Sequence, residues 1–526
     1  MIQSARGRLA AAAFIAIVAF PAAPVTVAQQ PTVSLAPVPR TIPRQLRGLD
    51  DYIERGMRAW KVPGLSIAVV KDDSVVYARG FGVRRVGTNE RVDERTLFAI
   101  GSSSKAFTAA AVAMLVDEKK VKWDDPATRH LPSLELFDPY ATRELTVRDL
   151  LSHRSGLARG DLVWYGSEFD RDEILRRVRY LEPSWSFRAR FGYQNIMYLA
   201  AGQTVEAVAK KSWDDFVDER IFTPLGMTAS STTVRALDGV ENVARPHSDS
   251  SGTVRAVPYR NIDNIAPAGS INSNAIEMAQ WIRLQLGNGT YEGKKLLSAE
   301  AVKEMHEPHT IIRREGPWAM MTPDASFMSY GLGWILHDYR GKKAVQHGGN
   351  IDGMHALVGM IPSEQVGVVI LTNLNPNALT TAIMNRVFDA YLGAPATDWS
   401  KQLLAAMDSL QGLQAAAQKR METARVDGTR PSVALEKYAG TYSHDMYGDV
   451  VVARNGDGLT IRRGQSFTAP LSHWHFDTFR IQAVGGGIGM GFVSFTLDPM
   501  GQVASLSLQG IGDFKRAPAA ATAASR

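Results

Sequence analysis

The chain has 526 residues, 45% hydrophobic and 21% charged, so it is long enough for several domains and apolar enough to form large cores. Its formal net charge of +6 is small for this length, and its basic residues form no concentrated stripe, which argues against nucleic-acid binding. Cysteine is absent, so disulfides, thiol catalysis and cysteine-bound metals are excluded.

Residues 1–28 are predicted to be a secretory signal peptide. Arg6 and Arg8 precede an apolar run, and Thr26 and Ala28 are small enough for a signal-peptidase site. The run is too short to span a membrane comfortably, and no cysteine follows it that could carry a lipid. We therefore expect a protein exported to the periplasm or secreted, without a stable membrane anchor once the signal has been cleaved.

An α/β pattern is expected over residues 46–395. The apolar segments 65–70 and 75–79, separated by a Lys-Asp-Asp-Ser turn, predict a β-hairpin. Residues 103–116 predict a helix, because this alanine-rich stretch carries larger apolar residues at four-residue spacing. The continuous apolar run 366–371 predicts a buried strand. One sheet is therefore expected to begin near residue 65 and to be completed near residue 371, around a helical middle.

The remaining segments differ in composition and in the secondary structure that they predict. Residues 396–431 predict a helical linker, and residues 432–516 predict a small antiparallel barrel or sandwich, because short strands alternate there with turns. Residues 29–45 are predicted to be a linker rich in proline, and the alanine-rich residues 517–526 a disordered tail. The strands predicted in the C-terminal domain are 450–453, 459–462, 479–482, 492–497 and 503–508.

Gly-Ser-Ser-Ser-Lys at 101–105 is the first chemical signal. Ser102 comes where a strand-like segment meets the predicted helix, and it would lie at the positive end of the helix dipole. Lys105, three positions on, shares its helix face. A buried lysine loses its charge readily and can then take the proton of a serine. On its own the pattern is weak, because a serine here is more often a helix N-cap.

Three further segments strengthen that signal. Tyr193 and Asn195 open a second helical stretch in the sequence Phe-Gly-Tyr-Gln-Asn. His347 and the two glycines after it precede two apolar strands, and Leu-Ser-His-Arg-Ser-Gly-Leu at 151–157 closes a predicted helix. The histidine of that segment, His153, is expected to order the loop that supports the cleft.

In these motifs the chain resembles the serine beta-lactamase and penicillin-binding protein family, specifically its class C-like esterase and D-aminopeptidase branch. Ser-x-x-Lys at 102–105, Tyr-x-Asn at 193–195 and His-Gly-Gly at 347–349 have the family's order and spacing, over a likeness that covers residues 46–392. The resemblance implies an antiparallel sheet flanked by helices, an all-helical part, and a nucleophile at a helix N-terminus between them. It also implies that the C-terminal domain is a lipocalin-like barrel.

The family pattern assigns roles by chemistry. Ser102 is expected to attack a carbonyl and become acylated, while Lys105 and Tyr193 share the work of the general base. Tyr193, with an ordinary pKa near ~10, would need a neighbouring cation to be an effective base. Asn195 would position Lys105 and the substrate amide.

The His-Gly-Gly segment supplies the rest of the expected site. The oxyanion hole would consist of the backbone N–H groups of Ser102 and Asn350, and Gly348 and Gly349 would let the strand approach the substrate closely. His347 stands where true beta-lactamases have the lysine of Lys-Thr-Gly. It is expected to bind a substrate carboxylate or to assist the tyrosine, although a mostly neutral histidine makes carboxylate recognition less secure.

One further departure and one exclusion complete the expected site. Relatives often have Pro-Gly where this chain has Phe187-Arg188, so a different turn is expected before Tyr193, with Arg188 and Arg190 adding positive charge near the cleft. No cofactor and no metal is expected. His306 and His309 are separated by a proline, lack a third ligand and are expected at the surface.

The function expected from the resemblance is an exported serine hydrolase that cleaves amide or ester bonds. A peptidase or amidase for short or D-amino-acid-containing peptides, linearised cyclic peptides included, is favoured, because some relatives carry a similar barrel that rims the cleft and limits entry. Carboxylesterase and beta-lactamase are the alternatives, and a non-catalytic penicillin-binding sensor or scaffold is the least favoured. Some barrel-bearing relatives assemble further, so the question of a homo-oligomer stays open.

Overall fold

The computed structural model describes residues 41–249, 252–465, 467–482 and 491–518. The predicted signal peptide and most of the two terminal segments lie outside these residues. Within the described ranges, every helix falls short of the length and apolarity needed to cross a membrane.

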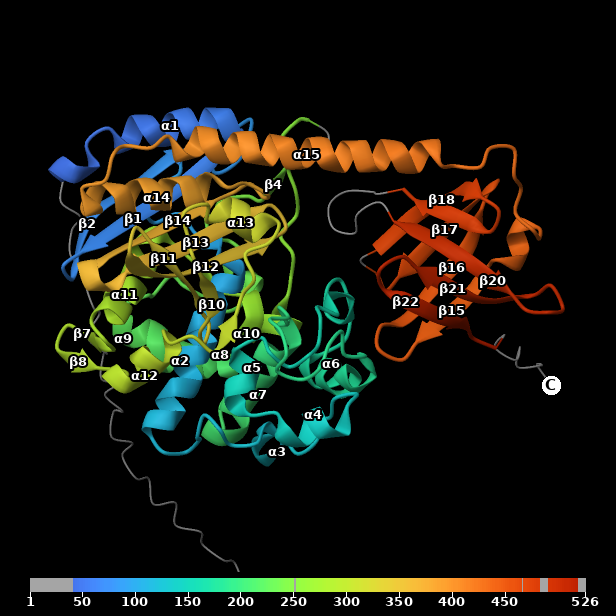
Figure 1. The fold of residues 1–526 in the computed structure, drawn as a ribbon, viewed down its shortest axis with the longest axis horizontal. Helices are drawn as coiled ribbons and strands as arrows, with labels where there is room; N and C mark the ends of the chain where they lie inside the picture. The colour runs from blue at the N-terminus through green and yellow to red at the C-terminus, as the bar shows by residue number, and fades with distance from the viewer. Residues whose placement is uncertain (1–40, 250–251, 466, 483–490, 519–526) are drawn as a thin grey trace, which may run out of the picture.

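An eight-stranded antiparallel sheet forms the centre of the larger domain, in the order β2-β1-β14-β13-β12-β11-β10-β9 (Figure 1). Strand β1 pairs with both β2 and β14, so strands from the two ends of the domain meet in one sheet, as predicted. The strands are β1 (Gly64–Lys71), β2 (Ser74–Gly82), β9 (Thr310–Ile311), β10 (Met328–Tyr330), β11 (Ile335–Tyr339), β12 (Lys342–Ile351), β13 (Met354–Ile361) and β14 (Val366–Thr372).

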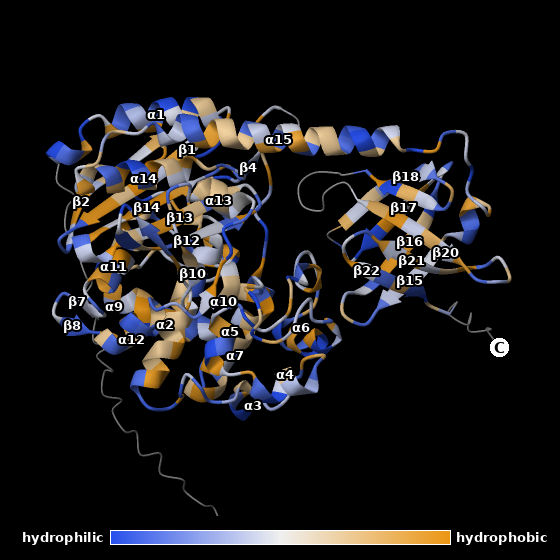
Figure 2. Ribbon diagram, viewed as in Figure 1, coloured by the Kyte–Doolittle hydropathy of each residue, from blue (hydrophilic) through white to orange (hydrophobic). Residues whose placement is uncertain are grey.

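Strand β1 is apolar throughout because both of its faces are covered. Ala68 and Val70 belong to the core shared with the helical part, whereas Leu65, Ile67 and Val69 belong to a second core on the opposite face. This alternation follows from the two-residue period of a strand. Figure 2 shows the central strands coloured mainly as hydrophobic.

Helices cover both faces of the sheet. Helices α1 (Leu49–Trp60) and α14 (Leu379–Leu392) contribute to the second core, and α11 (Ala275–Leu286) packs against β1 and β14 from the other side. The buried residues of α1 recur every three or four positions, as expected for an amphipathic helix that covers a sheet.

The helical part lies below the sheet in Figure 1 and is built around α2 (Ser104–Asp117) and α7 (Asn195–Ala209), which pack together. The other helices of the larger domain are shorter: α3 (Ala127–His130), α4 (Pro139–Glu144), α5 (Val147–Leu151), α6 (Arg171–Arg177), α8 (Trp213–Val217), α9 (Thr223–Leu225), α10 (Ala266–Gly269), α12 (Ala299–Met305) and α13 (Pro317–Met321). The predicted α/β architecture with an all-helical part is confirmed.

Helix α15 (Trp399–Thr423) leads from the larger domain to a closed barrel of eight antiparallel strands (Figure 1). The predicted small barrel is therefore present, and a sandwich is excluded. Its strands are β15 (Gly440–His444), β16 (Gly448–Asn455), β17 (Gly458–Arg463), β18 (Phe467–His475), β19 (Thr478–Ile481), β20 (Phe492–Leu497), β21 (Val503–Leu508) and β22 (Gly512–Arg516).

Candidate active site

Ser102 lies in a single 3₁₀ turn, Gly101–Ser103, between the short strand β3 (Phe98–Ala99) and the first residue of α2. Gly101 adopts a left-handed φ of +52°, and a Cβ added to it would come within 2.7 Å of the Asn350 nitrogen. Only glycine tolerates both the conformation and the closeness. The turn therefore brings Ser102 directly against strand β12.

Lys105 is completely buried beneath this serine. Its Nζ lies 3.0 Å from Ser102 Oγ, 2.7 Å from Asn195 Oδ1 and 2.7 Å from the Ala268 carbonyl oxygen. Burial moves the pKa of Lys105 well below its ordinary value; the negative charge of Asp161 partly opposes this change, and the positive charge of Arg159 adds to it. Lys105 can therefore exist as the neutral amine that a general base requires.

Tyr193 reaches the same serine from the loop that precedes α7. Its hydroxyl hydrogen-bonds with Ser102, and Lys105 Nζ lies 4.8 Å from the centre of its ring. Burial raises the pKa of Tyr193 above its ordinary value, against the lowering effects of the Ser102 hydrogen bond and of Arg159. The tyrosine therefore rests as a neutral hydroxyl, which favours Lys105 as the first proton acceptor.

His347 has both ring nitrogens engaged by the protein. Its Nδ1 lies 2.6 Å from the Gly348 carbonyl oxygen, to which it must donate, so Nε2 accepts from the Tyr330 hydroxyl at 2.9 Å. Burial lowers the pKa of His347 to about 3, with Lys105 adding to the effect. The ring is therefore neutral, and this argues against a role as the cation that binds a substrate carboxylate.

Strand β12 packs against the Ser102 turn at Gly349. A Cβ added there would lie 1.7 Å from the Ile100 oxygen and 2.8 Å from the Ser102 nitrogen. No side chain fits in that space, so Gly349 is what allows β12 to run beside the nucleophile. Ser102 and Asn350, the two expected oxyanion donors, both line the cleft.

His153 supports Tyr193 from behind. Its Nδ1 accepts from the Gln194 N–H at 3.1 Å, and its ring centre lies 4.3 Å from that of Tyr193 and 4.5 Å from that of Tyr330. Burial, followed by the nearby positive charges, holds the pKa of His153 well below its ordinary value. These contacts connect the 151–157 segment to the loop that carries Tyr193, in agreement with the architectural role expected for His153.

Asp161 was not predicted from the sequence, although it accepts a hydrogen bond from Asn195 and its charge acts on Lys105. Its Oδ1 accepts from Asn195 Nδ2 at 2.8 Å and from Trp164 Nε1 at 2.8 Å, and Arg159 pairs with its other oxygen at 3.2 Å. The residue begins a single 3₁₀ turn, Asp161–Val163, which is too short to carry a periodic pattern. No local pattern could have identified it.

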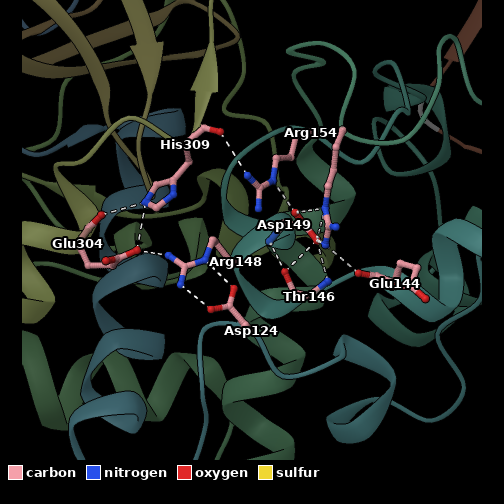
Figure 3. A network of polar contacts seen from close by, with 9 residues as sticks. Asp124, Glu144, Thr146, Arg148, Asp149, Arg154, Glu304 and His309 are labelled. Carbon is pink, nitrogen blue, oxygen red and sulfur yellow. Dashed lines mark hydrogen bonds and ion pairs between the residues drawn. The ribbon is translucent and has the colours of Figure 1, made fainter.

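The expectation that Arg188 adds positive charge to the cleft is wrong. Its side chain turns instead to the buried carboxylate of Asp149, 2.6 Å away. Arg154 and the Thr146 cap contact the same carboxylate (Figure 3). Burial alone would raise the pKa of Asp149, but hydrogen bonds from Arg188, the Thr146 backbone and Arg154 hold it below its ordinary value. Arg188 has a left-handed φ of 60°, a conformation that favours glycine.

This conformation leads to a stability prediction. Arg188→Ala is expected to lower the free energy of unfolding by about 1–2 kcal/mol, because a partly exposed partner of Asp149 is lost. Arg188→Gly loses the same ion pair but relieves the left-handed strain, so it should be more stable than Arg188→Ala by about 1 kcal/mol. Urea unfolding of the two variants measures the difference, and an alanine variant as stable as the glycine variant would contradict it.

The surface position expected for His306 and His309 is also wrong. Both rings are largely buried, His306 against Trp334 and His309 beside Glu304. Burial lowers the pKa of His306 to about 3 and that of His309 to about 4, so both are neutral core residues. In the described ranges, no group of three or more histidine, aspartate or glutamate side chains is arranged to hold a metal ion.

The cleft above Ser102 has a volume of about 1050 Å³. Its walls come from every part of the molecule: the 159–165 loop, Trp318 of α13, Met407 of α15 and Ile511 of the barrel. The barrel and the long helix therefore take part in shaping the space that a substrate would enter.

The position of Lys105 also predicts a pH dependence. If neutral Lys105 is the base, kcat/KM should rise with pH as Lys105 loses its proton. Because burial depresses its pKa, this rise should be complete well below the value near ~10.4 of an exposed lysine. A pH–rate profile measures this, and a rise found only above about pH 10 would mean that the resting lysine is charged.

Comparisons with known proteins agree with this geometry. The family model described as Beta-lactamase matches residues 49–390, and a domain of unknown function, DUF3471, matches residues 424–520. Unguisins hydrolase ungD of Aspergillus violaceofuscus is 30% identical over 435 residues, 76% of each chain. Penicillin-binding protein 4 of Amycolatopsis lactamdurans is 28% identical over 63% of this chain and 85% of its own.

Two solved structures share the fold. The octameric penicillin-binding protein homologue from Pyrococcus abyssi has a TM-score of 0.59 at 24% identity, over 89% of this chain and 99% of its own. SurE has a TM-score of 0.53 at 20% identity, over 90% of this chain and 99% of its own. With the matched family model covering most of the larger domain, the chain belongs to the beta-lactamase family of serine hydrolases and penicillin-binding proteins.

Proposed function

We propose that the protein is an exported serine hydrolase that cleaves amide bonds in short peptides through an acyl-enzyme at Ser102. The observation that carries the proposal is the 3.0 Å contact between Ser102 Oγ and the Nζ of the buried Lys105, at the floor of a large cleft. A buried amine beside a serine hydroxyl is the arrangement that nucleophilic catalysis requires.

Acylation follows from this contact. Neutral Lys105 takes the Ser102 proton as Oγ bonds to the substrate carbonyl carbon, and the backbone N–H groups of Ser102 and Asn350 stabilise the oxyanion. When the C–N bond breaks, the proton passes from Lys105 through the Tyr193 hydroxyl to the leaving amine.

Deacylation reverses the proton path. A water molecule gives its proton to the Tyr193–Lys105 pair as its oxygen bonds to the acyl carbon. The ester bond to Oγ then breaks, the product acid leaves, and Ser102 recovers its proton. In both steps Asn195 holds Lys105 in place through the 2.7 Å hydrogen bond to its Oδ1.

Two observations support a short peptide as substrate. Met407 and Ile511 line the cleft, so α15 and the barrel limit the space that a substrate can occupy. The relative described as an unguisins hydrolase is 30% identical over 76% of this chain. We extend the proposal to D-amino-acid-containing and linearised cyclic peptides on these grounds.

Carboxylesterase activity uses the same acyl-enzyme and is the second candidate. Efficient beta-lactamase activity is less favoured, because the ring at position 347 is neutral and engaged by Tyr330. A sensor or scaffold is disfavoured by the complete set of Ser102, Lys105 and Tyr193 in hydrogen-bonding or ring contact.

The test is a substrate panel with purified protein, using Ser102→Ala as the blank. The panel contains D- and L-aminoacyl p-nitroanilides, short peptides with a D-residue at either side of the cleaved bond, p-nitrophenyl esters and nitrocefin. Peptide or anilide turnover above ester and nitrocefin turnover is expected. Preference for esters would select the esterase candidate, and no turnover or fluorophosphonate labelling by folded protein would overturn the proposal.

A further inference from the structure

The barrel touches the larger domain at the loop formed by residues 159–165. Arg463, at the end of β17, donates from Nη2 to the Leu162 carbonyl oxygen at 2.6 Å and from Nη1 to the Tyr165 carbonyl oxygen at 3.2 Å. Its Nε and Nη2 also contact the Tyr447 carbonyl oxygen, at 3.4 and 3.3 Å. One guanidinium therefore joins the barrel wall to two points of the loop.

This arginine is costly to bury. It is only 6% exposed, and in the described part of the chain no carboxylate forms an ion pair with it. Burial, aided by the positive charge of Arg177, lowers the pKa of Arg463 to about 10, so the group stays charged at neutral pH. A buried charge that is satisfied only by carbonyl oxygens stabilises a fold poorly compared with an apolar side chain. Stability therefore does not account for this buried arginine, and its role is better explained by the segments that its hydrogen bonds connect.

The loop that Arg463 holds contains Asp161, which accepts a hydrogen bond from the side-chain amide of Asn195. Leu162, whose carbonyl binds the guanidinium, is the next residue along the chain. Asp161 Oδ1 lies 2.8 Å from Asn195 Nδ2, and Asn195 Oδ1 lies 2.7 Å from Lys105 Nζ. The amide of Asn195 is thereby fixed in one orientation, with its oxygen toward Lys105 and its nitrogen toward Asp161.

A second contact runs beside this one. Arg177 of α6 donates to the Asp445 carbonyl oxygen at 2.6 Å, between β15 and β16, and its guanidinium lies 4.1 Å from the ring centre of Phe169. The 159–165 loop and the segment after it are thus held along one side by barrel residues. Arg463 differs from Arg177 because its contacts fall within the loop itself.

We propose that Arg463 is a positioning residue through which the C-terminal barrel holds the 159–165 loop, and with it Asp161, Asn195 and Lys105, in the reactive arrangement. The barrel then positions residues of the active site, in addition to forming a wall of the cleft. The inference rests on the proposed function for its kinetic consequence, but the holding of the loop is measurable without any substrate.

The test uses the full-length chain with Arg463→Met, a substitution of similar length that removes the guanidinium. Arg463→Met is expected to lower kcat by about 10- to 100-fold, because the groups around Lys105 lose their fixed geometry. Thermal unfolding should stay unchanged or improve, since a buried cation is replaced by an apolar side chain. Reduced stability that accounts for all of the lost activity would overturn the proposal.

The chain offers a matched control in Arg516 of the same barrel. Arg516 also donates only to carbonyl oxygens, those of Lys437, Val503 and Ala439, but all three lie in or beside the barrel. Arg516→Met should leave kcat within about twofold of the parent protein. If this variant fails to fold, the exposed neighbour Arg462, which donates to the Gly464 carbonyl oxygen, replaces it as the control. Equal losses in Arg463→Met and the folded control would overturn the proposal.

A double-mutant cycle with Asp161→Ala tests the route. If Arg463 acts through Asp161, the double variant should be no slower than Asp161→Ala alone, whereas independent effects multiply. Arg463→Lys, which keeps a cation, should recover part of the rate. Multiplying losses would show that Arg463 acts by another path and would overturn the proposal.

Amide hydrogen exchange separates this inference from the proposed function. Arg463→Met should accelerate exchange in residues 161–166, and the Arg516 control should not. If the parent protein labels at Ser102 and Arg463→Met labels equally fast with unchanged exchange, the inference fails while the proposed function stands. If the parent protein proves inactive, the exchange result alone decides whether the barrel holds the loop.

Discussion

Ser102→Ala is expected to lower kcat by about 10⁴-fold or more and to abolish labelling by a fluorophosphonate, because the oxygen that would form the proposed acyl-enzyme is removed. Lys105→Met should cause a loss of similar size, since the buried amine 3.0 Å from Ser102 Oγ is the proposed proton acceptor. Groups that act as a unit lose their effect together, so the double variant should be no slower than either single variant.

The measurement is single-turnover and steady-state kinetics on the best substrate of the panel, with circular dichroism to verify folding. Lys122→Met is the matched control, because this lysine is exposed and lies outside the cleft. A Ser102→Ala protein that retains more than about a hundredth of the rate would refute Ser102 as the nucleophile. A Lys105→Met protein that labels at the normal rate would refute the lysine as the base.

Gly349→Ala is expected to lower kcat by about 10²- to 10³-fold while the protein still folds, because the new methyl group must push β12 away from the nucleophile turn. The added Cβ would lie 1.7 Å from the Ile100 oxygen and 2.8 Å from the Ser102 nitrogen. Any relief of that clash separates Ser102 and Asn350, whose N–H groups are the proposed oxyanion donors. The loss should therefore appear in kcat more than in KM.

The adjacent glycine provides the control for this experiment. A Cβ on Gly348 would meet its nearest protein atoms at 3.6 to 3.9 Å, which is ordinary contact, so Gly348→Ala should leave β12 in place and lower kcat much less than Gly349→Ala does. Equal losses in the two alanine variants would mean that the strand tolerates no substitution at all. An unimpaired Gly349→Ala protein would contradict the placement of the oxyanion hole.

The sequence alone determined the features that local periodicity carries. The continuous apolar runs of β1 and β14 and the alanine-rich helix α2 predicted the sheet and the helix under the nucleophile. The pairing of Ser102 with Lys105 follows from helix geometry, because residues three apart share a face. In such segments the positions that are apolar in the sequence are the positions that the fold buries.

The barrel shows where this correspondence weakens. Five of its strands were predicted, but β15, β18 and β22 were not. In β15 only Tyr442 is buried, and in β22 only Phe514 is, so neither strand carries an alternation that a pattern could detect. Closure of the barrel pairs β15 with β22, and this long-range pairing stabilises strands whose own sequences are weak.

Only the tertiary structure decided which polar side chains of distant loops meet. Asp161 reaches Asn195 across 34 residues, Arg188 reaches Asp149 across 39, and Arg463 reaches Leu162 across 301. Irregular loops have no period, so nothing local marks which of their polar side chains meet.

Burial decided the rest. The sequence marks His347 as a titratable group, but the depth at which it lies and the hydroxyl of Tyr330 make it neutral. The same physics makes the amine of Lys105 available as a base. The order of the motifs could therefore be read from the chain, whereas the charge states that let them act depend on the folded protein that surrounds them.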